Sequence, residues 1–155
     1  MRDFGKSLVK IDPLKAFSDE NLKIVGIREE LEMSQEKLII HVGKHSLAAK
    51  LEENSSVTAL KELLQEKPLT IRMRDYARME KVGDIGRSLP TNDRPTHAKP
   101  CDLILYLGNS FVIYYESNSW NFTRLGKIEN VTPKELRTIL GQGDVSVTLE
   151  LSDPE

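Results

Sequence analysis

From residue 38 onward, apolar and polar residues alternate in several short segments that are separated by turn-forming residues. A period of two is typical of β-strands that bury one face. Segments 38–42 and 47–51 flank Gly43 and Lys44, which predicts a hairpin. Further strands are predicted over residues 69–73, 103–107, 111–115, 122–128 and 145–151. We expect the last of them to pair with the first hairpin, so that the sheet closes.

Two of these strands, 103–107 and 111–115, are apolar on both faces and are joined at Gly108 and Asn109, a favourable turn pair. Both of their faces must therefore be covered. By contrast, residues 91–100 contain two prolines and several turn-forming residues, so we interpret them as a long surface loop.

Two short helices are predicted between the strands. The first begins at the capping residues 54–56, carries apolar residues at helical spacing over 57–64, and ends before Pro68. The second begins at Thr132–Glu135, where Thr is the N-cap, Pro is the first helical residue and Glu completes a capping box. Gly141 suits the residue after its C-terminus.

Seven or eight strands with two short helices favour a barrel or a sandwich over an α/β sheet. The length of 155 residues suits one core. We therefore predict a mainly β domain over residues 38–155, formed as a closed barrel of about eight strands. Residues 1–37 are less regular and are interpreted as an N-terminal arm or accessory element, with one short strand predicted at 22–27.

The near-neutral charge of the sequence argues against binding to nucleic acids, which depends on positive charge. The chain has 22 basic and 24 acidic side chains and a formal net charge of -2, and no five-residue block is dominated by Lys and Arg. Nucleic-acid binding requires a concentrated cationic face, so we do not expect it. The sequence has no run of 18 apolar residues and no signal-peptide pattern, so we expect a cytoplasmic protein without a membrane partner.

The usual signatures of catalysis and of cofactor or metal binding are missing from the sequence. His41, His45 and His97 lack metal-ligand spacing, and Cys101, the only cysteine, cannot form an intrachain disulfide or a thiolate zinc site. There is no Gly-x-Ser-x-Gly motif and no glycine-rich phosphate loop. We therefore predict no cofactor and no metal. Whether the protein is an enzyme stays open, and no residue is assigned as catalytic.

Among the four Phe, four Tyr and one Trp, six residues lie between 106 and 122: Tyr106, Phe111, Tyr114, Tyr115, Trp120 and Phe122. Neighbouring strands would gather several of these rings around one cavity, a common way to hold a small ligand or an apolar peptide side chain. Trp120 follows the polar residues 116–119, where a large ring is most useful at the rim of a cavity. The alternative is that the rings fill the core of a small barrel.

A charged segment without simple periodicity follows the strand at 69–73; it contains Asp75, Tyr76, Arg78, Glu80 and Lys81. We interpret it as part of a barrel mouth, with Arg78 or Lys81 pairing with a ligand carboxylate and Tyr76 stacking beside it. The alternative is an exposed turn with Glu80 and Lys81 in solvent. Three further arginines would form an anion-binding strip if their strands were adjacent, and would otherwise be exposed: Arg72, Arg74 and Arg124.

Several short motifs follow one another in a familiar order: Leu69–Tyr76, Glu80-Lys81, Leu89-Pro90, Cys101–Tyr106, Phe111–Tyr115 and Arg124–Ile128. With this order the chain resembles, over residues 38–151, the bacterial cyclophilin-like fold family of uncharacterised small barrels. The resemblance implies a closed cyclophilin-like β-barrel flanked by two helices. It does not imply prolyl isomerase activity, because the sequence has no Phe-His-Arg triplet and its Gln-Gly-Asp run, 142–144, lies beside the last strand, out of the cyclophilin order.

Three functions remain open. The first is a binding module that holds a small molecule or a short peptide in an aromatic and basic cleft. Its expected ligand-binding residues are Tyr76, Glu80, Lys81, Tyr106, Tyr115, Trp120 and Arg124. The second is a divergent peptidyl-prolyl cis-trans isomerase, in which Arg124 or Arg72 donates a hydrogen bond to the X-Pro amide. The third is an interaction domain without a pocket, which contacts another protein through residues 91–100 and the N-terminal arm.

Overall fold

The computed structural model describes residues 2, 3, 5, 6 and 36–152. The two short strands β1 (Arg2–Asp3) and β2 (Gly5–Lys6) pair with each other in parallel. The described residues from 36 onward belong to a separate unit. Most of the arm predicted over residues 1–37, including the strand predicted at 22–27, lies outside the described residues.

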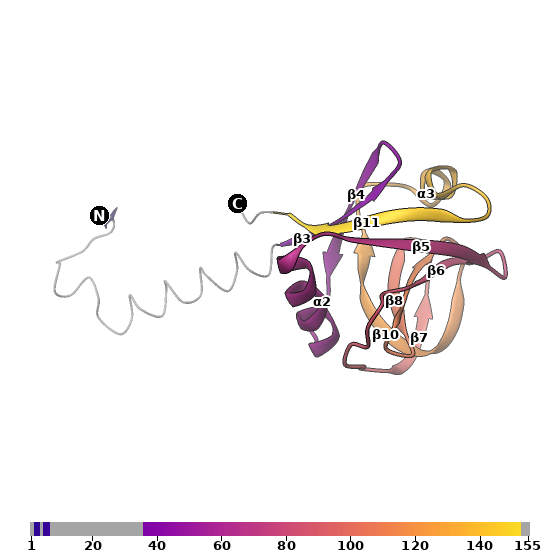
Figure 1. Cartoon of the computed structure of the whole chain (residues 1–155), viewed down its shortest axis with the longest axis horizontal. Helices are drawn as coiled ribbons and strands as arrows, with labels where there is room; N and C mark the ends of the chain where they lie inside the picture. Colours follow the sequence, from indigo (N-terminus) through magenta and orange to yellow (C-terminus); the bar gives the residue numbers. More distant parts are fainter. Residues whose placement is uncertain (1, 4, 7–35, 153–155) are drawn as a thin grey trace. The chain divides into compact units, whose positions relative to one another are not determined.

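Nine antiparallel strands follow in the second unit (Figure 1). They are β3 (Lys37–Val42), β4 (His45–Leu51), β5 (Leu69–Tyr76), β6 (Glu80–Asp84), β7 (Arg94–Ala98), β8 (Asp102–Tyr106), β9 (Ser110–Tyr114), β10 (Asn118–Ile128) and β11 (Val145–Leu151). Eight of them run in the spatial order β4, β3, β11, β5, β6, β9, β8 and β10. Because β10 also pairs with β4, the sheet closes into an eight-stranded barrel, and β7 pairs with the first half of β10.

This architecture confirms the mainly β fold and the closed barrel with two helices. The hairpin β3–β4 forms as predicted, and β11 lies between β3 and β5 in the sheet, so the last strand does pair with the first hairpin. The buried residues of these strands are the alternating apolar ones, such as Leu38, Ile40, Val147 and Leu149. The apolar residues of the period-two pattern therefore form the interior of the barrel.

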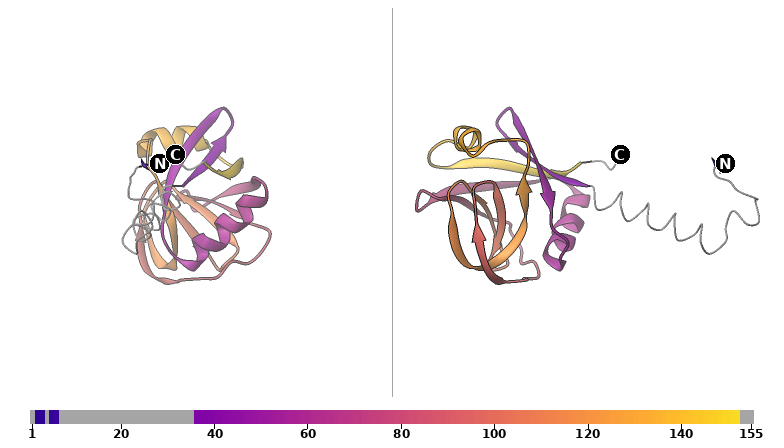
Figure 2. Two further views of the ribbon diagram at one scale, coloured as in Figure 1. Left: turned by 90° about the vertical axis from the view of Figure 1, so that its left-hand side faces the viewer. Right: turned by 180° about the vertical axis from the view of Figure 1, so that it is seen from behind.

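Both helices begin with the predicted caps. The Asn54 side chain accepts a hydrogen bond from the Val57 amide at 2.8 Å at the start of α2 (Ser55–Glu66). Before α3 (Pro133–Leu140), Thr132 and Glu135 form the capping box, and Gly141 ends the helix with a φ of 70°, which favours glycine. Figures 1 and 2 show α2 and α3 on separate sides of the barrel, and apolar residues of both helices join the interior cluster.

The strands β8 and β9 are buried on both faces, as their apolar sequences require. Their odd-numbered residues, such as Leu103 and Phe111, join the large interior cluster of the barrel. Their even-numbered residues, such as Ile104 and Val112, belong to a second cluster on the outer face, with Phe122 from β10. The outer face of this side of the barrel therefore has its own small core.

Two strands were not predicted. β6 forms between residues 80 and 84, where the charged residues Glu80 and Lys81 hide the strand pattern although both are buried. β7 forms inside the segment 91–100, so the prediction of a continuous surface loop there is wrong. β7 pairs with β10 alone, and Pro95 is compatible with such an edge strand because one side of the strand needs no amide donor.

The barrel closes at Gly126, which lies opposite Leu51 of β4 and Leu103 of β8 in a strand whose register shifts between Arg124 and Gly126. A Cβ atom at this position would lie 2.2 Å from the Lys50 carbonyl oxygen. Only glycine lets the backbones of β10 and β4 approach this closely. The same strand carries Trp120 before the shift, because β10 begins at Asn118 and not at the predicted residue 122.

Candidate functional site

A cleft of about 510 Å³ lies over the outer face of β5, β6, β9, β8 and β10, and we call it the aromatic cleft. Alternate residues of each strand line it, because side chains at positions i and i+2 share one face of a sheet. Five rings contribute to its walls: Tyr76, Tyr106, Tyr114, Trp120 and Phe122. Its polar lining includes Arg74, Glu80 and Asn118.

Three side chains at this cleft are unusually exposed for their type. Tyr76 is 56% exposed, Leu107 is 70% exposed and Trp120 is 62% exposed. Over the described residues these are the large hydrophobic side chains that are exposed, and all three line the aromatic cleft. Single exposed apolar residues are common, but their convergence on one concave surface indicates an interaction site.

The base of the aromatic cleft is packed and hydrogen-bonded. The rings of Tyr114 and Phe122 lie with their centroids 5.9 Å apart at a tilt of 47°, a favourable arrangement for two aromatic rings. Asn118 donates from Nδ2 to the Tyr114 hydroxyl oxygen at 3.1 Å. This hydroxyl in turn donates to the Glu80 carboxylate. The side chains beneath the exposed rings are therefore held in place before any ligand binds.

Glu80 is the buried charged group of this cleft, with 9% of the residue exposed. Burial raises the pKa of its carboxyl group, the hydrogen bond from Tyr114 partly offsets this effect, and the charge of Asp75 adds to the increase. Within residues 36–152, no ion pair to Glu80 is formed. Burial also raises the pKa of Tyr114, so its hydroxyl stays protonated and continues to donate.

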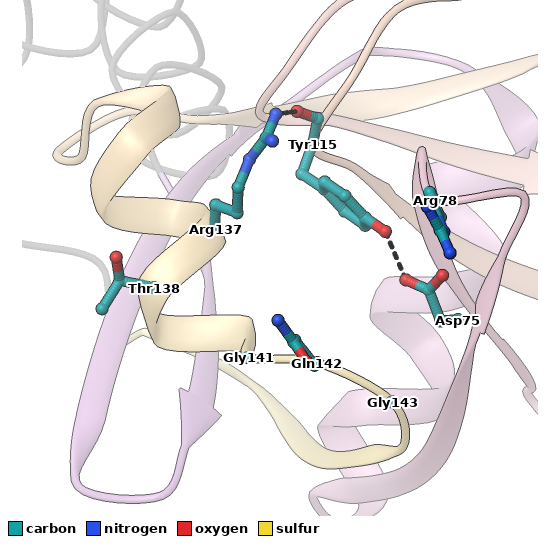
Figure 3. Close-up of a pocket in the computed structure, with 8 residues that line it drawn as sticks. All are labelled: Asp75, Arg78, Tyr115, Arg137, Thr138, Gly141, Gln142 and Gly143. Carbon is teal, nitrogen blue, oxygen red and sulfur yellow. Dashed lines mark hydrogen bonds between the residues drawn. The ribbon is translucent and has the colours of Figure 1, made fainter.

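A second cavity of about 830 Å³, the mouth pocket, lies between the β5–β6 turn and the loop that follows α3 (Figure 3). It is lined by Asp75, Arg78, Tyr115, Arg137, Thr138 and residues 141–143. In Figure 3, the Tyr115 ring lies between the helix that carries Arg137 and the strand that carries Asp75. Arg137 contributes to this wall by donating to the Tyr115 carbonyl oxygen at 3.2 Å and by pairing with Glu116.

Lys81 is fully buried beneath this pocket, and its charge is already satisfied. Its ammonium donates to Asp75 at 3.2 Å and to the Gly143 carbonyl oxygen at 2.7 Å, and it lies 5.7 Å from the centroid of the Tyr115 ring. Burial alone would raise the pKa of Asp75, but the hydrogen bonds from Tyr115 and Lys81 outweigh it and hold that pKa below its ordinary value. Burial and the bond to Asp75 raise the pKa of Tyr115 to about 12. The contacts among Lys81, Asp75 and Tyr115, together with the hydrogen bond from Lys81 to Gly143, hold the loop after α3 against the barrel.

Arg124 lies at a third cavity, of about 450 Å³, together with His97. Its guanidinium pairs with Asp102 at 2.7 Å and donates to the His97 carbonyl oxygen at 3.3 Å. The strip expected from Arg72, Arg74 and Arg124 does not form, because β6, β9 and β8 separate β5 from β10 in the sheet. Of these three arginines, Arg74 is the one that lines the aromatic cleft.

The structure thus divides the residues that the sequence placed in one cleft. Tyr76, Glu80, Tyr106 and Trp120 meet at the aromatic cleft. Tyr115 lines the mouth pocket, Lys81 lies beneath it, and Arg124 lines the third cavity.

The predicted set of ligand-binding residues left out several that line the aromatic cleft, among them Leu107, Asn118 and Tyr114, although Tyr114 was one of the six clustered rings. The parity of the positions would have found Tyr114 and Asn118. Even-numbered residues of β6, β9 and β10 face the cleft, as the pairing of Glu80 with Tyr114 shows. Leu107 lies in the β8–β9 turn, for which parity gives no signal.

Other chemistry receives little support from the part of the chain that the structure describes. There, no three His, Cys, Asp or Glu side chains are grouped as a metal site. Burial raises the pKa of the Cys101 thiol, which lowers its fraction of reactive thiolate. Over the same residues, no helix has the length and apolar character that are needed to cross a membrane.

Comparison with known proteins agrees with the barrel and with the resemblance inferred from the order of motifs. The sequence model of the cyclophilin-like family matches residues 40–150. No curated protein matches the chain. The solution structure of the hypothetical protein AF2241 from Archaeoglobus fulgidus is similar in fold, with a TM-score of 0.53 and 13% identity over 76% of this chain and 95% of that chain. The chain belongs to the cyclophilin-like family.

Proposed function

We propose that this protein is a binding module whose aromatic cleft holds the ring-bearing part of a small molecule or of a short peptide. The observation that carries the proposal is the convergence of the exposed Tyr76, Leu107 and Trp120 on one cleft. A volume of about 510 Å³ falls within the usual range for ligand sites. Ring faces supply binding area, while Glu80, Asn118 and Arg74 supply polar groups that orient a ligand.

The side chains at the base of the aromatic cleft are already packed in the free protein, which favours a binding role for the cleft. Tyr114 and Phe122 are 2% exposed and pack on the outer core cluster, so the walls need little reordering when a ligand arrives. Preorganised side chains reduce the entropic cost of association. The isomerase alternative lacks comparable support, because neither Arg72 nor Arg124 lines the aromatic cleft.

Saturation-transfer NMR with indole, p-cresol and cyclohexanol tests the proposal. The wild-type protein should bind indole and p-cresol in preference to cyclohexanol, because flat rings stack on Trp120 and the tyrosines. Trp120→Ala should weaken indole binding by at least about fivefold, which corresponds to one lost aromatic contact.

Gln142→Ala in the mouth pocket is the matched control, since Gln142 is exposed and lies away from the outer face. It should bind indole like the wild-type protein. Equal indole binding by wild-type and Trp120→Ala proteins would refute the proposal, provided that both show the same far-UV circular dichroism.

A further inference from the structure

The Glu80 carboxylate is buried at the base of an apolar cleft without a cation beside it. The residue is 9% exposed, and its bonding partner is the neutral hydroxyl of Tyr114. Elsewhere in residues 36–152, the buried charges Lys81 and Asp102 each have an oppositely charged partner. Buried charges are normally paired, because desolvation penalises an unpaired ion. Among the described residues, Glu80 by contrast has no oppositely charged side chain within ion-pair distance.

Strand register places two tyrosines directly opposite Glu80. Tyr76 of β5 and Tyr114 of β9 are the residues opposite Glu80 on its two neighbouring strands. Cβ atoms of directly opposed residues lie about 4.5–5.5 Å apart on the same face of a sheet. A cation that reaches Glu80 therefore also comes close to aromatic rings, whose negative faces attract it.

The other charged and titratable groups facing the cleft do not supply this cation. From β5 comes Arg74, which is exposed and forms no ion pair among the described residues. From β8 and β9 come Tyr106 and Tyr114, and from β10 the uncharged Asn118 and Trp120. Solvent screens the field of the exposed Arg74 more than that of the buried Glu80. Among the described residues, none of these groups therefore forms an ion pair with the Glu80 carboxylate.

We propose that the ligand of the aromatic cleft is a small organic cation, a ring-bearing amine whose ammonium group pairs with Glu80 while its ring stacks on Trp120 and Tyr106. This inference rests on the proposed function of the cleft and adds the charge of the ligand. In a site that is partly shielded from water, a charge-assisted hydrogen bond gives a cationic ligand a much higher affinity than a neutral ligand of the same shape. Arg74, which is exposed at the same cleft, would form an ion pair with an anionic substituent on the same ligand.

Three probes that differ mainly in charge test the inference: phenethylamine, 2-phenylethanol and 3-phenylpropionate. Trp120 is the single tryptophan of the chain and lines the cleft, so its fluorescence reports binding of each probe. We expect phenethylamine to bind about tenfold more tightly than 2-phenylethanol, because of the charge-assisted bond to Glu80. We expect 3-phenylpropionate to bind most weakly.

Glu80→Gln should abolish this preference, so that phenethylamine and 2-phenylethanol bind the variant with similar affinities. The amide oxygen of Gln can still accept the hydrogen bond from Tyr114, so the variant keeps the wall of the cleft. Glu62→Gln is the matched control, because Glu62 is exposed on α2. It should retain the wild-type preference.

The pH dependence of the wild-type protein gives a readout that needs no variant. Phenethylamine requires the ionised form of Glu80, so its affinity should fall as the pH is lowered through the pKa of Glu80. The affinity for 2-phenylethanol should not follow this titration. Phenylalanyl-glycyl-glycine amide and its N-acetylated form separate a peptide N-terminus from a free amine as the source of the cation.

Each outcome decides between the two proposals. Equal affinities for the three probes, unaffected by Glu80→Gln and by pH, would overturn the charge assignment and leave the ring-binding function intact. Tightest binding of 3-phenylpropionate would overturn it in favour of Arg74. Failure of all three probes, together with indole, to bind would overturn the proposed function itself.

Discussion

Glu80 and Lys81 are neighbours in the sequence and bury their charged groups on opposite faces of β6. Glu80 points to the aromatic cleft on the outer face, and Lys81 reaches Asp75 and Gly143 at the mouth pocket. The adjacent strands repeat this division, with Tyr76 and Tyr114 facing the cleft and Asp75 and Tyr115 facing the mouth pocket. Among the described residues, Glu80 has no oppositely charged partner, whereas Lys81 pairs with Asp75. Glu80 is therefore the candidate ligand-binding group, and Lys81 has a structural role.

Lys81→Met should destabilise the barrel by about 2–3 kcal/mol, somewhat less than for a fully buried pair because the Asp75 side chain is 25% exposed. The change keeps the apolar stem of the side chain but leaves Asp75 without its cation and Gly143 without its donor. Urea denaturation measures the free energy of unfolding. The double variant Asp75→Asn with Lys81→Met should recover part of the loss. A loss below about 0.5 kcal/mol for Lys81→Met would show that this pair is energetically neutral.

Gly126→Ala should prevent stable closure of the barrel. A Cβ atom 2.2 Å from the Lys50 carbonyl oxygen forces β10 away from β4, and both partners of the clash are backbone. We expect a loss of at least about 3 kcal/mol, above the usual cost of overpacking, because neither backbone can move aside without breaking the strand pairing. Thermal unfolding followed by circular dichroism measures it. A variant with the wild-type midpoint would mean that β10 and β4 are not paired here.

Leu107→Asn should stabilise the protein and weaken ligand binding. Leu107 and Gly108 both have positive φ values, 56° and 78°, and Asn109 donates to the Tyr106 carbonyl oxygen across the turn. Asn followed by Gly is the preferred pair in such turns, whereas leucine costs about 1 kcal/mol there. Thermal unfolding should show the gain, and indole titration should show the lost contact. Unchanged stability together with unchanged indole affinity would contradict the role given to Leu107.

Glu80→Gln should raise stability at neutral pH. Because burial raises the pKa of Glu80 in the folded state, ionisation of this carboxyl opposes folding at a pH above that value. The penalty disappears as the pH falls through the folded-state pKa toward the ordinary value of 4.5. Urea denaturation from pH 7 to pH 4.5 should therefore show a stability advantage for Glu80→Gln that shrinks with acidity. An advantage that grows with acidity would reverse the sign assigned to this group.

The barrel could be predicted because alternation and capping are local signals. Leu38 and Ile40, the turn at Gly43 and the capping box at Thr132 each specify their own element, and the structure has all of them. β6 escaped prediction because its buried residues include charged ones, whose partners come from elsewhere in the chain. Lys81 finds Asp75 across the β5–β6 hairpin and Gly143 from the loop after α3, and no local pattern reveals that pairing.

The candidate site was predicted in part for the same reason. Clustering in sequence identified Trp120 and Tyr106, and the charged segment identified Tyr76 and Glu80, all of which line the aromatic cleft. Assigning Tyr115 and Arg124 to the same cleft required the strand order and the facing of each residue. Tyr115 faces the mouth pocket, one position beyond Tyr114, and Arg124 is paired with Asp102. The spacing of residues in the sequence reveals neither the side of the sheet that Tyr115 faces nor the ion pair of Arg124.

Mapping of amide chemical shifts during an indole titration tests the aromatic cleft most directly. We expect the perturbed amides to concentrate in β5, β6, β8, β9 and the first half of β10, around Tyr76, Tyr106 and Trp120. Amides of residues 141–143 in the mouth pocket should stay unchanged. Perturbations confined to that pocket or to the surroundings of Arg124, or no saturable perturbation at all, would show that the aromatic cleft does not bind indole.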